Sequence, residues 1–261
     1  MPIAYNLVPQ RFEDGRHLAI SEGLERCGFE VRTQWRGEAP GLGDVLAVWN
    51  LHFPLARQAH EVFKAKSLPT LVFEEAYTRR LYPEKHFACA VNGHNGSGWW
   101  PHGDGSRWER LGIALKPWRR EGSHILVCAA RGMGAPGMAE PKGWADEVCR
   151  RLCQLTDHPV SLRRHPGKHY VDRPLELDLE GAWAVVVWGS NCATHALADG
   201  IPVFLEGPAH VLAGACQRGL KDIDTPTYPE RLTAFQRLAW AQWSMEEIAV
   251  GDPFTHLLER R

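Results

Sequence analysis

A short basic motif in the second half of the chain has residue types that bind phosphate. Arg164 and His165 are adjacent and are followed by Pro166. A guanidinium group offers forked N–H donors to phosphate oxygens, and an imidazole can add another. Because proline disfavours a helical backbone at the preceding residue, the His165 side chain is expected to turn off the end of a strand. The motif indicates a phosphate clamp, and a surface turn is the alternative.

A second motif lies where an apolar strand passes into a helix. The strand ends at Gly189, and either Ser190 or Asn191 is suited to cap the helix that follows. The start of such a helix presents free N–H groups and the positive end of the helix dipole, which together attract anions. Thr194 and His195 fall in the first turn, where they could reach the same ligand. The alternative is an ordinary capped helix after a strand.

A glycine-rich loop follows the apolar run 124–129. Arg131 supplies a positive charge, and Gly132, Gly134 and Gly137 free the backbone N–H groups to face a phosphate. No Gly-Lys-Ser/Thr triplet follows, so the loop is not a P-loop. We expect Arg131 and Gly132 to contact a ligand, and a flexible connector is the alternative.

Taken in order, these motifs resemble the donor half of GT-B glycosyltransferases. The resemblance rests on Arg164-His165-Pro166, Gly189-Ser190-Asn191, His195-Ala196-Leu197, Gly200 and Pro202-Val203. It is strongest to the sialyl-, Kdo- and polysaccharide-type transferases that carry an HP motif, and it extends to short phage-encoded glycosyltransferases. This sequence departs from the family pattern at Asn191 and Cys192, where a second Ser or Thr is common.

The resemblance implies an α/β fold of GT-B type, in which two Rossmann-like domains face a cleft and C-terminal helices cross back. The implied boundaries are 1–120 for the acceptor-side domain, 121–230 for the nucleotide-sugar-binding domain, and 231–261 for helices packing back on the first domain. The residues expected to bind the donor are Arg131, Gly132, Arg164, His165, Ser190, Asn191, Thr194 and His195.

The first half of the chain carries the candidates for a catalytic base. Glu74 and Glu75 follow an apolar strand, and an inverting sugar transfer needs one group to take a proton from the acceptor hydroxyl. His94 and Asp104 are the second choices. The alternative for the two glutamates is a helix start whose acidic residues complement the helix dipole. A retaining mechanism, which stays open, would not need this base.

The segment 92–104 breaks the regular pattern because it is rich in Gly, Asn and His and carries adjacent tryptophans. We expect a long functional loop at the acceptor side, since loops on α/β scaffolds commonly carry the chemistry. Tryptophans could stack on a base or sugar, and arginines could track phosphates. The residues expected to contact the acceptor are Arg79, Arg80, Asn92, Asn95, Trp99 and Trp100.

The elements that must position these residues alternate between strand and helix, which predicts parallel sheets covered by helices. Strands are predicted at 1–7, 29–34, 45–49, 70–73, 124–129, 160–163, 183–188 and 201–205, and helices at 14–27, 55–66, 144–156 and 193–199. The tail, 228–258, is predicted to be helical. A break near residue 120 separates two α/β halves.

Composition narrows the class of protein. The 261 residues are 44% hydrophobic and 23% charged, as in ordinary globular proteins, and the net charge of −1 excludes a wholly basic nucleic-acid coat. No apolar run approaches the length of a bilayer span, so no membrane partner is expected. Seven scattered cysteines without a C-x-x-C pair favour a reducing cytoplasm and no zinc site.

The expected function is a hexosyltransferase-type glycosyltransferase that uses a nucleotide sugar, with a UDP-sugar favoured and no metal required. The resemblance to phage-encoded proteins suggests double-stranded DNA with 5-hydroxymethylpyrimidine bases, such as 5-hydroxymethylcytosine, as acceptor. A phage enzyme of this kind would act in the host cytoplasm. A surface polysaccharide or other glycan is the alternative acceptor, and a non-catalytic nucleotide- or DNA-binding module of GT-B fold is the alternative function.

Overall fold

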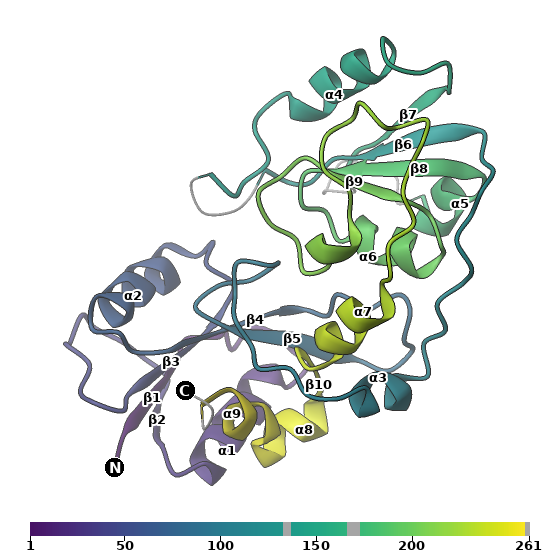
Figure 1. Cartoon of the computed structure of the whole chain (residues 1–261). Helices are drawn as coiled ribbons and strands as arrows, with labels where there is room; N and C mark the ends of the chain where they lie inside the picture. The colour runs from purple at the N-terminus through teal and green to yellow at the C-terminus, as the bar shows by residue number, and fades with distance from the viewer. Residues whose placement is uncertain (133–136, 166–172, 259–261) are drawn as a thin grey trace. The chain divides into compact units, whose positions relative to one another are not determined.

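The computed structural model describes residues 1–132, 137–165 and 173–258. Two predicted positions, Gly134 and Pro166, lie outside the described residues, as does the end of the predicted 231–261 segment. The chain divides into two compact units (Figure 1): unit 1 contains residues 1–107 and 237–261, and unit 2 contains residues 108–236. The predicted domain boundaries at 120 and 230 stay predictions.

Unit 1 is built on a six-stranded sheet with the strand order β10-β5-β4-β3-β1-β2. Its strands are β1 (Ile3–Asn6), β2 (Glu30–Arg32), β3 (Val45–Trp49), β4 (Thr70–Glu75), β5 (His86–Val91) and β10 (Gln242–Ser244). Strands β2, β1, β3 and β4 are parallel, and β5 runs antiparallel to both β4 and β10. The helices of this part are α1 (Arg16–Arg26), α2 (Pro54–Ala65), α8 (Met245–Val250) and α9 (Asp252–Leu258), and α3 (Ser106–Leu111) spans the boundary with unit 2.

Helices cover both faces of this sheet, which explains why β3 is buried along its whole length. On one face, Phe63 of α2 packs with Val72 of β4 in a shared apolar cluster. On the other face, the ring of Phe73 meets that of Phe254 of α9 at 6.2 Å. Helix α1 lies against α8 (Figure 1), and Gly23 allows this approach because a Cβ there would lie 2.0 Å from the Ile248 carbonyl oxygen.

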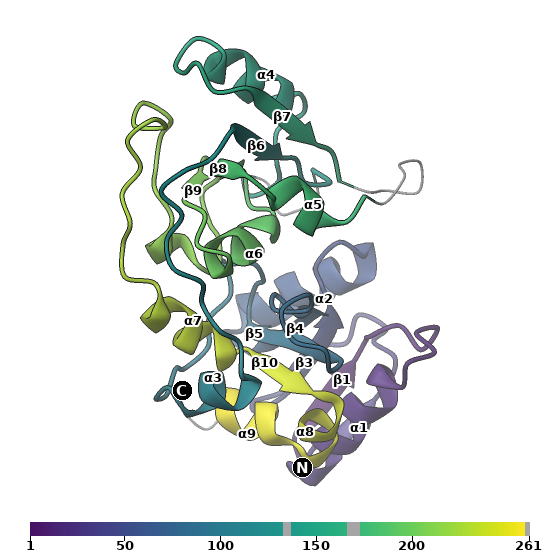
Figure 2. The ribbon, with the colours of Figure 1, turned by 90° about the vertical axis from the view of Figure 1, so that its right-hand side faces the viewer.

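The tail differs from its prediction as a helical segment. Residues 242–244 form strand β10, which pairs with β5 at the edge of the unit 1 sheet (Figure 2). Strand β5 itself was not expected, and β4 continues through Glu74 and Glu75 instead of ending at Phe73. The backbone hydrogen bonds of these strands are made with neighbouring strands, and β10 and β5 are far apart in the sequence. A local residue pattern does not show such pairing.

Unit 2 is built on a four-stranded parallel sheet with the order β7-β6-β8-β9. Its strands are β6 (His124–Cys128), β7 (Val160–Arg163), β8 (Ala182–Val187) and β9 (Val203–Leu205). Its helices are α4 (Trp144–Leu152), α5 (Leu175–Leu179), α6 (Cys192–Ala198) and the 3-10 turn Ala213–Ala215, and α7 (Leu232–Ala239) spans the end of the unit. The predicted mixed α/β class is therefore confirmed.

Both units place their second strand on one side of the first and their third strand on the other. In open α/β sheets, ligands bind outside the carboxyl ends of the strands where the order reverses in this way. The reversal lies between β1 and β3 in unit 1 and between β6 and β8 in unit 2. Within the part of the chain that the structure describes, no helix is long and apolar enough to cross a bilayer.

Candidate functional sites in the two units

The carboxyl edge of the unit 2 sheet brings together two residues that were expected to bind the donor. Arg131 follows β6 and His165 follows β7, and the Arg131 Nε donates to His165 Nδ1 at 3.2 Å. The strands are parallel neighbours, with Cys128 opposite Arg163, so the segments that leave them start side by side. With Nδ1 as acceptor, a neutral His165 carries its proton on Nε2. The pair therefore combines a fixed positive charge with an imidazole donor, which suits an anion.

Arg164 lies in a different direction from this pair. Its guanidinium forms an ion pair with Asp146 of α4 at 2.7 Å, and both side chains are about half exposed. Arg164 thus ties the end of β7 to α4, and the expected contact with a ligand stays a prediction.

The turn 189–191 precedes α6, as the sequence predicted, and Asn191 is the capping residue. Its side chain makes no bond to the first N–H groups of the helix; instead, Asn191 Oδ1 accepts a hydrogen bond from the Thr194 hydroxyl at 2.8 Å. Thr194 is fully buried, and its expected contact with a ligand stays a prediction. His195 is also buried, with 6% of its surface exposed. Ser190 Oγ accepts from the Cys192 N–H at 3.3 Å.

A carboxylate that sequence reasoning missed contacts the backbone just before the glycine-rich segment. Glu140 Oε2 accepts a hydrogen bond from the Ala130 N–H at 2.7 Å, directly after β6. Burial raises the pKa of Glu140. Gly132 has a φ of 66°, a backbone conformation that favours glycine. The Ala130 N–H group is therefore already bonded, while Arg131 beside it is exposed.

A second missed residue lies beneath the turn 189–191. His210 is 3% exposed, and its Nδ1 accepts a hydrogen bond from the Leu212 N–H at 3.1 Å. The other side of the ring faces the backbone of Ser190, and burial lowers the pKa of His210 to about 4. His210 is therefore neutral at pH 7. No sequence motif marks it.

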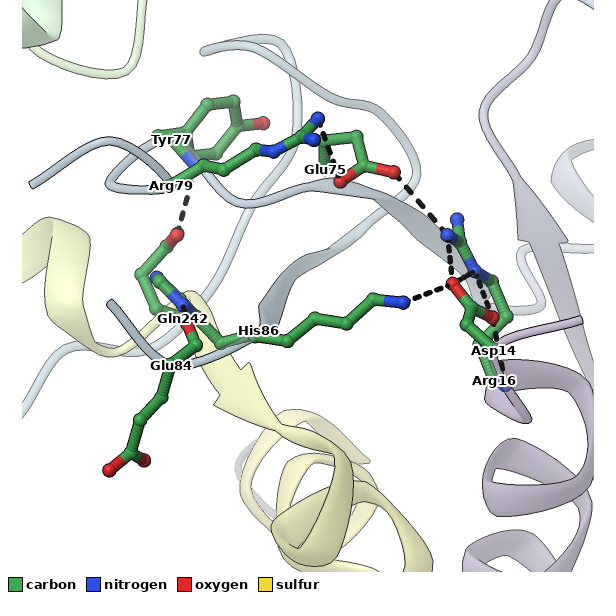
Figure 3. A network of polar contacts seen from close by, with 9 residues as sticks. Asp14, Arg16, Glu75, Tyr77, Arg79, Glu84, His86 and Gln242 are labelled. Atoms are coloured by element: carbon green, nitrogen blue, oxygen red, sulfur yellow. Dashed lines mark hydrogen bonds and ion pairs between the residues drawn. The ribbon is translucent and has the colours of Figure 1, made fainter. Parts of the chain in front are cut away.

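In unit 1, the two adjacent glutamates of β4 lie on opposite faces of the sheet, as successive residues of a strand do. Glu75 lies between two guanidinium groups (Figure 3): Arg16 is 3.4 Å away and Arg79 is 3.5 Å away. The Glu75 carboxylate is therefore held in ion pairs with two cations. The geometry thus separates the two candidate bases, which the sequence could not.

Arg16 anchors the Glu75 side of the sheet. Its guanidinium makes a forked ion pair with Asp14 and lies 3.9 Å from the ring centroid of Trp49. Hydrogen bonds from Arg16 and from Lys85 hold the pKa of Asp14 well below its usual range. This cluster is a buried structural anchor at the carboxyl ends of β1, β3 and β4.

Glu74 has a different environment. Its Oε1 accepts hydrogen bonds from the Tyr77 hydroxyl and from the Asn95 N–H, the latter at 3.1 Å. Burial raises the pKa of Glu74 to about 7, against the opposing effect of these two hydrogen bonds. A carboxylate with this pKa can take a proton near neutral pH. Tyr77 was not predicted, although its position three residues after Glu74 is visible in the sequence.

His94 lies next to Asn95 in the same loop, and its ring meets that of His52 at 5.9 Å. His52 follows β3, so the loops after β3 and β5 meet at this point. Burial lowers the pKa of His94, and its Nδ1 is buried without a hydrogen-bond partner among the described residues. The structure therefore gathers two of the predicted catalytic residues, Glu74 and His94, around one short loop.

The segment 92–99 is a tight hairpin and not an open loop. Trp99 pairs with Val91 through two backbone hydrogen bonds, and Asn92 Oδ1 accepts from the Thr70 N–H at 2.9 Å. Gly98 is required by packing, since a Cβ there would lie 2.5 Å from the Gly93 carbonyl oxygen. The glycines that suggested a ligand-binding loop therefore also allow close backbone contacts within this hairpin.

The two tryptophans of this segment have different environments. Trp99 is 42% exposed, whereas Trp100 is 4% exposed and its indole N–H donates to the Arg237 carbonyl at 2.9 Å. The Trp100 ring is therefore part of the core, and its expected contact with an acceptor stays a prediction. Arg79 and Arg80 are exposed, and their expected contact with an acceptor stays a prediction, as does that of Trp99.

Asp104 has a local structural role. Its Oδ1 accepts hydrogen bonds from the Ser106 N–H at 3.0 Å and from the Ser106 hydroxyl at 2.6 Å, at the start of α3. The Asp104 carbonyl accepts from the indole N–H of Trp240. This arrangement argues against Asp104 as the base. Across the described ranges, no group of three or more His, Cys, Asp or Glu side chains could hold a metal ion.

The solved structures with a similar fold include two of KpsC from Thermosulfurimonas dismutans. One is a beta Kdo 2,7 transferase, with a TM-score of 0.59, and the other is a beta Kdo 2,4 transferase, with a TM-score of 0.57. Each is 15% identical to this chain, and each alignment covers 92% of this chain and 90% of the other. At this identity the likeness shows a shared fold. No family model and no curated protein sequence matches the chain.

Proposed function

We propose that this protein is a glycosyltransferase that moves a sugar from a nucleotide sugar to an acceptor hydroxyl. The observation that carries the proposal is the pair Arg131 and His165, which converge at 3.2 Å at the carboxyl edge of a parallel sheet. The similarity of fold to two Kdo transferases supports the same class of reaction. In this proposal the fold is of GT-B type.

In the proposed reaction, unit 2 binds the donor. Arg131 and His165 donate to the phosphate oxygens, and the turn of Ser190 and Asn191 lies at the neighbouring strand end. Preorganised donors of this kind stabilise the negative charge that develops on a leaving phosphate. Such stabilisation can take the place of a metal ion, so we propose that none is required.

Unit 1 supplies the proton acceptor in an inverting reaction. Glu74 is favoured over Glu75, because Glu75 is ion-paired with both Arg16 and Arg79. The pKa of Glu74, about 7, matches what a general base needs near neutral pH. An acceptor hydroxyl would give its proton to Glu74 as its oxygen attacks the sugar.

The acceptor is proposed as a hydroxyl group on either a glycan or a 5-hydroxymethylpyrimidine base in DNA. The names of the two structural neighbours favour a sugar over DNA as the group to test first. Nucleotide release should therefore be measured with UDP-sugars and with an activated Kdo donor, each alone, with an oligosaccharide, and with hydroxymethylated DNA.

The deciding variants are R131A and H165A. Loss of one charge-assisted contact to a phosphate should weaken donor binding by about 10- to 100-fold. R150A is a matched control, because Arg150 is an exposed arginine of the same unit. The proposal fails if no donor is bound or turned over. It also fails if H165A and R131A behave like R150A, while binding without turnover would indicate a non-catalytic nucleotide-binding module.

A further inference from the structure

Both hydrogen bonds to the Glu74 carboxylate end on the same oxygen. The Tyr77 hydroxyl and the Asn95 N–H donate to Oε1, and the Asn95 N–H also lies 2.8 Å from the Tyr77 oxygen. The three groups form a closed triangle around one carboxylate oxygen. No residue that the structure describes donates a hydrogen bond to Oε2 of Glu74, so the two oxygens are chemically distinct.

Tyr77 is held in place by contacts that do not involve Glu74. It is 3% exposed, and its backbone N–H donates to the Gln242 side-chain oxygen of β10 at 3.0 Å. The next residue, Thr78, is hydrogen-bonded to His86 at 2.6 Å. Figure 3 shows Tyr77 joined to Gln242 in this way. Because its surroundings fix the ring, the hydroxyl is preorganised toward the carboxylate.

We propose that Tyr77 is a positioning residue that occupies Oε1 of Glu74 and leaves Oε2 to take the proton from the acceptor. The inference rests on the proposed function. As the acceptor O–H bond breaks, its proton goes to Oε2 and its oxygen bonds to the anomeric carbon of the donor sugar. The bond between that carbon and the phosphate oxygen breaks, and its electron pair leaves with the phosphate.

Other titratable groups surround this triangle. The Cys89 thiol of β5 lies close enough to Tyr77 to contribute to its raised pKa. His94 lies beside Asn95, and its ring contacts that of His52. Burial raises the pKa of Cys89 well above its usual range and lowers that of His94. Both shifts favour the neutral form of the side chain. All of these groups are present in wild type and in a Tyr77 variant alike, so a comparison of the two isolates the hydroxyl.

The test is a pH titration of Glu74 in Y77F. Loss of a hydrogen bond that favours the charged carboxylate should raise the pKa of Glu74 by about one to two units. The measurement is ¹³C NMR of glutamate-labelled protein, with the Glu74 signal identified by its absence in E74Q. Y82F is the matched control, since it removes a hydroxyl from the same segment, and it should leave the Glu74 titration unchanged.

A second measurement covers the case in which Y77F does not fold. Incorporation of 3-fluorotyrosine makes the phenol a stronger donor without removing it, and should lower the pKa of Glu74. An unchanged Glu74 titration in folded Y77F or in the fluorinated protein refutes the inference. This readout needs no substrate, so it is separate from the failure of the proposed function. If a donor is turned over, the acid limb of kcat should move upward in Y77F with the donor KM unchanged.

Discussion

The buried imidazole of His210 should make unit 2 lose stability as the pH falls. The pKa of His210 is about 4 in the folded protein, against 6.5 for an ordinary histidine. Below pH 6.5 the unfolded chain takes up a proton that the folded chain does not, so unfolding becomes more favourable. The full loss across this window is about 3 kcal/mol, since one pKa unit corresponds to about 1.4 kcal/mol. Between pH 7 and pH 5 the loss is about 2 kcal/mol.

The perturbation that isolates this effect is H210N. Asparagine keeps an acceptor that can serve the Leu212 N–H but cannot be protonated, so the pH-dependent part contributed by His210 disappears. Urea unfolding at pH 7 and pH 5 measures the free energy of unfolding, and hydrogen exchange of the buried β8 amides reports unit 2 by itself. H210N is expected to start less stable at pH 7 and to lose about 2 kcal/mol less than wild type on acidification.

His102 provides the control for this experiment, because it is an exposed histidine of unit 1. H102N should keep the wild-type difference between pH 7 and pH 5. If H210N shows the same loss as wild type and H102N, then the His210 ring is protonated in the folded state or open to water, and the reasoning from its burial is refuted.

Three further predictions concern stability. W100A should lower the free energy of unfolding by about 3 to 5 kcal/mol in urea, since it removes a core ring, whereas W99A should cost about 1 kcal/mol or less; equal effects would contradict the assignment of Trp100 to the core. R107A should cost about 2 to 4 kcal/mol because it leaves the Glu247 carboxylate without its forked partner, and E247Q in the same background should recover part of the loss by thermal unfolding. D14N should lower the free energy of unfolding by about 2 kcal/mol. Its cost should be equal at pH 5 and pH 7, because the folded pKa of Asp14 is depressed and its stabilisation is lost only in stronger acid; a cost that vanishes by pH 5 would contradict the ion pairing.

The fold was predictable where the chain carries long apolar runs. The strand 45–49 has its predicted bounds, because a buried parallel strand between helices leaves an unmistakable apolar stretch. The strand 160–163 also has its predicted bounds, although it alternates apolar and polar residues and lies at the edge of its sheet. Strand β10 has only three residues and is stabilised by its pairing with β5, so no local residue pattern could predict it. For the same reason the sequence did not predict that β4 extends through Glu74 and Glu75. It therefore did not predict that the two side chains lie on opposite faces of the sheet.

The candidate sites show a similar division. The residue types of Arg131 and His165 could be selected from their sequence context, and their closeness follows from parallel strand neighbours. The separation of Trp99 from Trp100 could not be predicted, because only packing against the tail decides which ring is buried. His210 was invisible for the same reason, since its role comes from what surrounds it.

The pairing of β10 with β5 has a consequence for how the protein is made. Unit 2 consists of one uninterrupted stretch, 108–236, whereas unit 1 draws on both sides of that stretch. During synthesis, residues 108–236 can complete their sheet before β10 has left the ribosome, while β5 must wait with an open edge. Unit 1 is therefore the first unit to be synthesised and the last to complete its sheet. Until β10 pairs with it, the exposed edge of β5 is where nascent chains would aggregate or bind a chaperone.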